Sequence, residues 1–303
     1  MFLADKYSSL LPFHHHHSKP SRRQQQKGEA HRFGTALAAR LRGLLPLPAS
    51  PLAALVRVAD LLALTLAEAG PALACSGEGA AVAAHLDAGV ALLDACNAIA
   101  ARLDGLRRRR LLASLALHLL LSSTSPSGRT RARAALADRD TPAASPAPPP
   151  LPWLPFEQPR GQLTAAARVL AAVDAVSSLA AAAAATVLAG GPATFPWISG
   201  GGGDDLPWAE PFNALSGQLA ALGAGEVRAV DEAVRRLASV LDSGTDDEGA
   251  VRAAAQEVGR RTEELAPRLD RLSDAVGGVF RAALGLRNAE LDCLMVGPAG
   301  KPV

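Results

Sequence analysis

The sequence predicts an all-α fold, an elongated bundle of long amphipathic helices. Ala and Leu supply most of the hydrophobic residues, which make up 49% of the 303-residue chain, and both residue types favour helices over strands. Only 4% of the residues are aromatic. Apolar residues also recur at spacings of three and four, which is the period of one helix face. These observations exclude an all-β fold, and the length permits one large domain or two small ones.

The first thirty residues form a predicted disordered tail. They contain four consecutive histidines (14–17) and three consecutive glutamines, without a lasting hydrophobic period. We interpret the histidines as a natural tract and not as a functional metal site. The segment lacks the apolar stretch of a secretory signal, and Asp5 and Glu29 weigh against a transit peptide. A cytoplasmic location is therefore expected, with a plastid location left open.

Residues 31–140 form a predicted N-terminal helical region. A first helix runs from about His31 until two prolines follow Leu45. Ser50 and Pro51 are typical of an N-cap and a first helical position, and the apolar stripe that follows ends at Gly70–Pro71. The next stripe runs from Leu86 to Leu106, followed by four arginines and a leucine-rich stretch up to Ser122.

Residues 141–161 form a predicted Pro-rich linker. Because proline fixes φ and lacks a backbone donor, an extended polyproline conformation is expected there. The linker precedes a C-terminal helical region, residues 162–303, which we expect to pack with the N-terminal helices as one domain.

The C-terminal region begins with a predicted Ala-rich helix over 162–189. A glycine-rich loop and a helix over about 209–222 follow. Two long stretches then carry apolar seams typical of coiled-coil packing, the first formed by Val227, Val230, Val234, Leu237 and Leu241. Pro267 interrupts the second seam, so a kink or a break is expected there.

The Ala-rich helix is also long enough to cross a membrane. No charged residue lies between Asp174 and Asp204, and a span requires about 20 residues. Ala, however, contributes little to membrane insertion. We therefore predict a buried central helix, with a marginal membrane segment as the alternative.

The chain shows no catalytic, cofactor-binding or metal-binding motif. Cys75, Cys96 and Cys293 are an odd number without the CxxC spacing of metal sites, which favours a reducing compartment. The glycine run at 200–203 lacks the Lys and Ser/Thr of a phosphate-binding loop. His85 and His118 are expected on separate helices as core or boundary residues. The sequence thus predicts neither an enzyme nor a bound cofactor.

Charge is distributed unevenly along the chain. Residues 1–140 hold 18 Lys and Arg against 10 Asp and Glu, whereas residues 141–303 hold 13 against 19, so the two halves are expected to attract each other. Nucleic-acid binding is disfavoured, because no stacking aromatic residue lies near the basic ones. Arg107, Arg108, Arg109 and Arg110 cover every direction around a helix. At least one should lie near the core side, where it either extends its charged end to solvent or pairs with a carboxylate; contact with anionic lipid or an acidic partner is the alternative.

Four stretches, in order, resemble the plant BYPASS-like family, which has a related branch of exocyst-associated ROH proteins. They read LLDACNAIAARL (Leu92–Leu103), LLASLALHLL (Leu111–Leu120), DDLPWAEPFNAL (Asp204–Leu215) and VFRAALGLRNAELDCL (Val279–Leu294). The specific motifs are Leu-Asp-x-Cys-Asn-Ala and Leu-Pro-Trp-Ala. The high proline content of the linker and the run of histidines depart from the family pattern.

The resemblance implies a non-enzymatic developmental regulator that restrains production of a root-derived mobile signal that arrests shoot growth. The ROH branch implies instead a membrane-associated trafficking or scaffold protein that binds an exocyst subunit. Either reading implies a protein partner, and the second adds peripheral membrane contact. No catalytic residues come with the family.

The motif residues are expected to act structurally: Asp94, Cys96, Asn97, Leu206, Pro207 and Trp208. Cys96 should pack as a small hydrophobe, and Asn97 as a buried amide that fixes helix register. Trp208 should dock its loop on the bundle, or else form an exposed partner contact.

Overall fold

The computed structural model describes residues 22–74, 79–122, 126–140, 151, 154–158, 162–190, 194–199, 206–223, 225–243 and 247–295. These residues contain helices and no strand, so the predicted all-α class is confirmed. The helices are α1 (Arg22–Leu44), α2 (Pro51–Ala74), α3 (Gly79–Ser122), α4 (Pro126–Asp140), α5 (Ala165–Ala184), the π-helical turn η1 (Ala185–Ala189), α6 (Ala209–Ala220), α7 (Gly225–Asp242) and α8 (Glu248–Met295).

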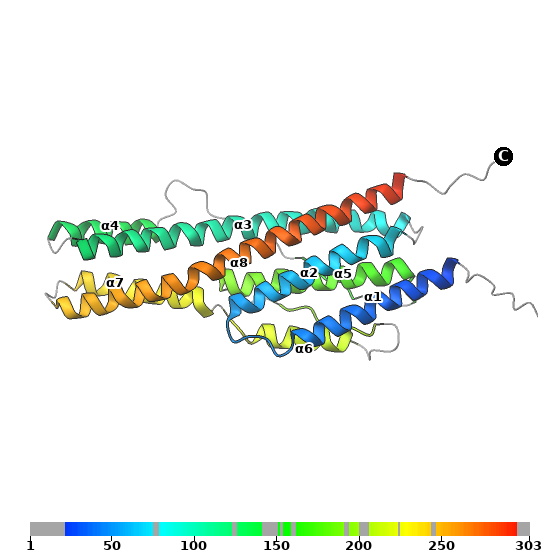
Figure 1. Cartoon of the computed structure of the whole chain (residues 1–303), viewed down its shortest axis with the longest axis horizontal. Helices are drawn as coiled ribbons and strands as arrows, with labels where there is room; N and C mark the ends of the chain where they lie inside the picture. Colours follow the sequence, from blue (N-terminus) through cyan, green and yellow to red (C-terminus); the bar gives the residue numbers. More distant parts are fainter. Residues whose placement is uncertain are drawn as a thin grey trace, which may run out of the picture.

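The molecule is an elongated bundle built along two long helices, α3 and α8 (Figure 1). α8 has 48 residues and packs against α2, α3 and α7. At one end, α4 and α7 lie beside α3 and the first half of α8, whereas α1, α2, α5 and α6 gather at the other end (Figure 1). The buried side chains form one continuous core through both groups.

α1 begins earlier than the sequence analysis placed it. The predicted tail included residues 22–30, but these are helical, and Ala30 is already buried together with Phe33 and Leu37. The reason is composition, because the Arg, Gln and Lys residues at the start of α1 are good helix formers. Residues 1–21 of the predicted tail lie outside the described residues.

α2 begins with the predicted cap and ends later than predicted. The backbone N–H of Ala53 donates to Ser50 Oγ at 3.2 Å, which confirms the cap. The helix does not stop at Gly70–Pro71 but continues to Ala74. Leu73 is 1% exposed and extends the buried stripe, so tertiary packing outweighs the proline, which itself lies exposed.

α3 is a single helix of 44 residues that joins the segments predicted around the arginines. His85 and His118 therefore lie on the same helix, not on separate ones. α4, which the sequence analysis did not identify as a separate helix, turns its buried residues Ala132, Ala135 and Leu136 inward and packs on α3.

The described part of the Pro-rich segment is non-helical and lies against the bundle. Leu154 is 7% exposed and belongs to the core. The ring centroids of Phe156 and Phe212 lie 6.4 Å apart. This part therefore covers the helices instead of only connecting them. Residues 141–150, 152–153 and 159–161 lie outside the described residues.

α5 occupies the centre of its end of the bundle, packed against α1, α2, α3 and α6. Thr164 Oγ1 caps it by accepting from the Ala167 N–H at 3.2 Å, and Gly190, at φ 68°, ends the following turn. By length and composition the segment Ala165–Ala189 qualifies as a membrane span, but 67% of its apolar window is buried inside the protein. This burial favours the core-helix interpretation.

The last helices follow the predicted seams. α6 starts at the predicted residue, and Val227, Val230 and Leu237 of α7 are buried. Of the kink or break predicted at Pro267, the break does not occur, because α8 is continuous through this residue. Leu265 and Leu269, on either side, are at most 3% exposed, so core packing holds both halves of α8 in one helix.

Candidate functional site

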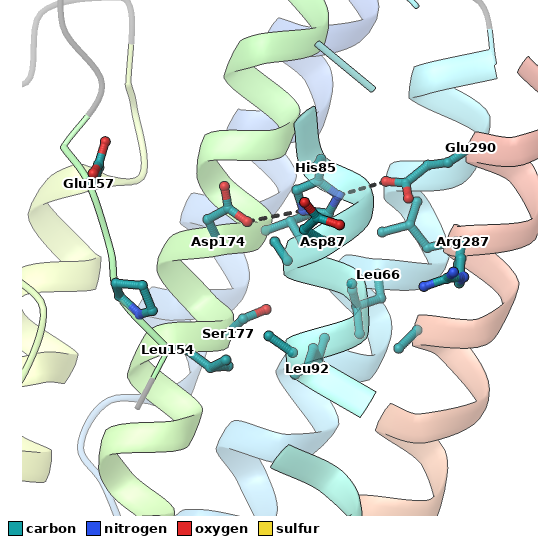
Figure 2. A pocket seen from close by; sticks show the side chains of 17 residues that line it. Leu66, His85, Asp87, Leu92, Leu154, Glu157, Asp174, Ser177, Arg287 and Glu290 are labelled. Carbon is teal, nitrogen blue, oxygen red and sulfur yellow. Dashed lines mark hydrogen bonds and ion pairs between the residues drawn. The ribbon is translucent and has the colours of Figure 1, made fainter. Parts of the chain in front are cut away.

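A histidine near the start of α3 lies between two carboxylates from other helices (Figure 2). His85 Nε2 is 3.0 Å from Asp174 Oδ1 on α5, and His85 Nδ1 is 2.7 Å from Glu290 Oε1 on α8. The side chains of His85 and Glu290 are 6% and 1% exposed, whereas that of Asp174 is 40% exposed. We call these residues the His85 cluster; it joins three helices.

The carboxylates keep His85 protonated. Burial alone would lower the pKa of the imidazole. The hydrogen bonds to Asp174 and Glu290, together with the charges of these carboxylates, outweigh this effect and raise the pKa from 6.5 to about 9. At neutral pH both ring nitrogens therefore carry protons and donate. Neither nitrogen is free to act as a base or a metal ligand in this arrangement.

A cavity of about 440 Å³ adjoins the His85 cluster. It is lined by residues of α2, α3, α5, α8 and the extended segment 154–157, with Leu66, Leu92 and Leu154 among its apolar walls (Figure 2). Cavities of this size accommodate small molecules.

The polar lining of the cavity includes one buried hydroxyl without a hydrogen-bond partner among the described residues. Ser177, one turn after Asp174 on α5, is 6% exposed, and its Oγ has no hydrogen-bond partner among the described residues. Leaving a buried hydroxyl unpaired costs about 1–3 kcal/mol. The exposed carboxylates of Asp87 and Glu157 and the guanidinium of Arg287 complete the charged lining.

A second, apolar cavity of about 30 Å³ shares Leu92, Leu154 and Ser177 with the first and is also lined by Cys96. Cys96 is 4% exposed, as predicted for a core residue, and burial raises the pKa of its thiol to about 11. The thiol is therefore protonated at neutral pH, which makes it a poor nucleophile.

Trp208 is a buried anchor. It is 1% exposed and packs edge to face on Phe212, with ring centroids 5.7 Å apart. α1 approaches so closely that a Cβ added at Gly34 would lie 3.3 Å from Pro207 Cγ and 3.6 Å from Trp208 Cδ1. The interpretation as an exposed partner contact is therefore wrong, and Leu206 and Pro207 are half-buried beside the anchor.

The predicted role of Asn97 is also wrong. Its side chain is exposed, as is that of Asp94. Successive side chains on a helix are about 100° apart, so the burial of Cys96 turns its neighbour Asn97 towards solvent. An exposed amide cannot fix the register of a buried seam.

Two polar residues that no sequence pattern indicated hold the loop before α6 in place. Asn213 accepts from the Ile198 N–H and donates to the Ile198 carbonyl, both at 2.9 Å. The buried Ser216 hydroxyl donates to the Pro196 carbonyl at 2.7 Å. Asn213 belongs to the stretch DDLPWAEPFNAL, but no local pattern in the sequence identifies its distant partner.

Two of the four consecutive arginines form ion pairs with carboxylates and two do not, within the described residues. Arg107 contacts Asp104 at 3.2 Å and Asp270 at 3.0 Å, and Arg109 lies 3.8 Å from Asp231. Of the two predicted arrangements near the core side, pairing with carboxylates is the one observed, for Arg107 and Arg109. Within the described part of the chain, Arg108 and Arg110 form no ion pair.

The basic and acidic halves of the chain also meet. Besides the contacts of Arg107 and Arg109, Arg133 of α4 lies 2.8 Å from Asp242 of α7. These pairs join the predicted basic N-terminal region to the acidic C-terminal one.

Comparisons with known proteins add no assignment. No protein-family model, no curated protein and no solved structure matches the chain. Among the described residues no group of three or more His, Cys, Asp and Glu side chains could hold a metal ion, and His118 is exposed.

Proposed function

We propose that the protein is a non-enzymatic regulator of plant development that restrains production of a root-derived mobile signal that arrests shoot growth. The proposal rests on the resemblance to the BYPASS-like family. The observation that carries it is that the two specific motifs of that resemblance, around Cys96 and Trp208, contribute to one continuous core. Residues far apart in the sequence thus contribute to the same packing, as expected if the motifs preserve a bundle.

The geometry also supports a role without catalysis. Both nitrogens of His85 are engaged by carboxylates, and the thiol of Cys96 is buried and protonated. These two side chains, of the types that enzymes use as a base and a nucleophile, are thus held in unreactive forms. A regulator would act instead through its surface and its protein partners.

Grafting tests the signalling role. A root that lacks this protein and its redundant paralogues should arrest the growth of a wild-type shoot grafted above it. The reciprocal graft, a mutant shoot on a wild-type root, should grow normally. An unaffected wild-type shoot on the mutant root would refute the assignment.

A second candidate function is the exocyst-linked, membrane-associated role of the ROH branch. One surface of α3 favours it: Leu111 is 59% and Leu115 is 47% exposed, at positions three and seven after the exposed Arg108. These three side chains lie on the same helix face. Apolar and basic side chains on one face are typical of contact with anionic membranes.

Vesicle sedimentation tests this candidate. The full chain should sediment with phosphatidylcholine vesicles that contain phosphatidylserine, and less with phosphatidylcholine alone. Replacing Leu111 and Leu115 with Ser should reduce binding, whereas Leu64→Ser, at a leucine of α2 that is 51% exposed, should not. Equal binding by all variants would exclude this surface, and co-precipitation of an exocyst subunit would test the partner.

A further inference from the structure

The cavity beside the His85 cluster has the features of a binding site that the proposed function does not use. Residues of four helices and the segment 154–157 surround it. Its lining combines aliphatic walls with charged groups, and Ser177 Oγ is a buried polar atom at the cavity without a partner in the described chain. A bound molecule with a hydrogen-bonding group would satisfy that hydroxyl.

We propose that this cavity binds a small organic cation with a compact apolar body, and that its ammonium group lies between Asp174 and the hydroxyl of Ser177. The inference rests on the cavity alone and does not depend on the proposed developmental role.

The charge of the lining favours a cation. Asp87, Glu157, Asp174 and Glu290 contribute four carboxylates, against one guanidinium from Arg287 and one imidazolium from the His85 cluster. The described lining therefore has an excess of negative charge. Asp174 uses Oδ1 for His85, and its side chain is 40% exposed, so the carboxylate can accept a second charged donor.

An anion fits less well. Both N–H groups of His85 already donate to carboxylates, which leaves only Arg287 among the lining residues to hold a negative group. An anion would also lie close to the carboxylates of Asp174 and Glu290. The like charges would repel each other in a partly buried site, where screening by water is weak.

The position of Ser177 fits an ammonium group. Ser177 follows Asp174 by three positions on α5, so the two side chains project from the same helix face. Figure 2 shows both on the side of α5 that faces His85 and Leu92 across the cavity. A hydroxyl oxygen and a carboxylate oxygen on one face provide two acceptors for the N–H groups of an ammonium ion.

The apolar walls favour an organic cation over a metal ion. Leu66, Leu92 and Leu154 offer no ligand atoms, and the neighbouring 30 Å³ cavity is lined by residues that are apolar except for Ser177 and Cys96. Burying CH₂ groups against such walls makes a favourable contribution to binding, because it removes apolar surface from water. A short alkyl chain would gain this contribution, whereas a hydrated metal ion would not.

Calorimetric titration of the full-length protein at pH 7 tests the proposal. Three probes share one alkyl body: hexylamine, 1-hexanol and hexanoate. Hexylammonium should bind about tenfold more tightly than the alcohol, and hexanoate should bind most weakly. Equal binding of the three probes, or the absence of hexylammonium binding, would overturn the proposal; in the second case the cavity holds only water.

Two variants locate the ammonium group. Ser177→Ala removes a hydroxyl that has no hydrogen-bond partner among the described residues, so folding should be retained while hexylammonium binding weakens about three- to tenfold. The matched control is Ser178→Ala, because Ser178 is also buried and unpartnered in the described chain but is not among the residues lining the cavity. Equal effects of the two variants would contradict the proposed position.

Glu157→Gln provides a test independent of α5. Glu157 is exposed at the rim and takes no part in the His85 cluster, so its neutralisation should weaken hexylammonium binding about twofold and strengthen hexanoate binding. Glu232→Gln, on the exposed face of α7, should change neither. Unchanged binding in Glu157→Gln would show that the lining charge does not select the ligand.

Discussion

His85 Nδ1 on α3 lies 2.7 Å from Glu290 Oε1 on α8, and this contact joins the first turns of one long helix to the last turns of another. Asp174 adds a third helix through His85 Nε2. A buried cation held by two carboxylates stabilises a fold only while it is protonated, because its neutral form loses both charged hydrogen bonds.

Stability should therefore fall at alkaline pH. His85 has a pKa of about 9 in the folded protein and an ordinary value of 6.5 when unfolded. Its contribution is fully present below pH 6.5 and is lost as the pH rises through 9. We expect the free energy of unfolding, measured by urea denaturation, to decrease by up to about 3 kcal/mol over this range.

Two variants check the origin of this pH dependence. His85→Gln should flatten the profile between pH 6.5 and 9, and should destabilise the protein at pH 7 by about 3–5 kcal/mol because buried Glu290 loses its cationic partner. His118→Gln, at the exposed histidine of the same helix, should retain the wild-type profile. A profile that stays unchanged in His85→Gln would assign the pH dependence to other groups.

Two glycines should respond in opposite directions to the same substitution. Gly225 starts α7 at φ 32°, and an added Cβ would lie 2.6 Å from Pro51 Cγ, a ring atom that cannot rotate away. Gly225→Ala should therefore destabilise the protein by about 1–3 kcal/mol. Gly217 lies exposed within α6 with nothing within 4 Å of an added Cβ, so Gly217→Ala should stabilise by about 0.5–1 kcal/mol.

Thermal and urea denaturation of both variants would measure this difference. The wild type supplies the common reference, and the two substitutions add the same methyl group. If Gly225→Ala is as stable as the wild type or more stable, the close approach of α7 to the start of α2 is not a constraint on residue 225.

Local patterns predicted those parts of the fold that depend on local chemistry. The cap at Ser50, the end of the Ala-rich helix at Gly190 and the seam of α7 all follow from neighbouring residues. The predicted helix boundaries were wrong where packing against distant residues outweighed a local sequence signal. Leu73 keeps α2 helical beyond Pro71, because its burial contributes more than the proline costs at an exposed position near the helix end.

The candidate site was harder to predict, because its parts are far apart in the sequence. His85, Asp174 and Glu290 come from three helices, and no spacing in the sequence connects them. Asn97 shows the converse failure: the motif identified a polar residue next to a core cysteine, but helix geometry turned it outwards. For Trp208, its size and its place after Pro207 indicated either an anchor or an exposed partner contact, and its burial in the folded protein decides for the anchor.

Replacing Pro267 with alanine should stabilise α8. Pro267 lies exposed in the interior of a continuous helix, so its ring has little packing to lose. Alanine restores a backbone donor, and its helix propensity exceeds that of proline by about 3 kcal/mol, which is an upper limit because proline also restricts the unfolded chain. Urea denaturation should show a gain of about 1–2 kcal/mol. A loss of stability would indicate that α8 requires a bend at this position.

Two tryptophans near the start of α6 differ in burial, so the effects of replacing a buried and an exposed indole can be compared. Trp208 is 1% exposed and packs on Phe212, whereas Trp197 is 57% exposed. Trp208→Ala should lower the free energy of unfolding by about 3–5 kcal/mol, because it leaves a cavity between α1 and α6. Trp197→Ala should change it by less than about 0.5 kcal/mol. Guanidinium denaturation followed by circular dichroism measures both values.

If the proposed developmental role is right, the same two variants will also differ in a complementation test in a plant. A loss of about 3–5 kcal/mol is a large fraction of the stability of an ordinary domain, so Trp208→Ala should accumulate poorly and rescue a loss-of-function line only in part. Trp197→Ala should accumulate at the wild-type level. If Trp197→Ala nevertheless fails to restore shoot growth, its exposed indole contacts a partner. If Trp208→Ala accumulates normally, the anchor does not stabilise the bundle, and the structural role assigned to the Leu-Pro-Trp-Ala motif is refuted.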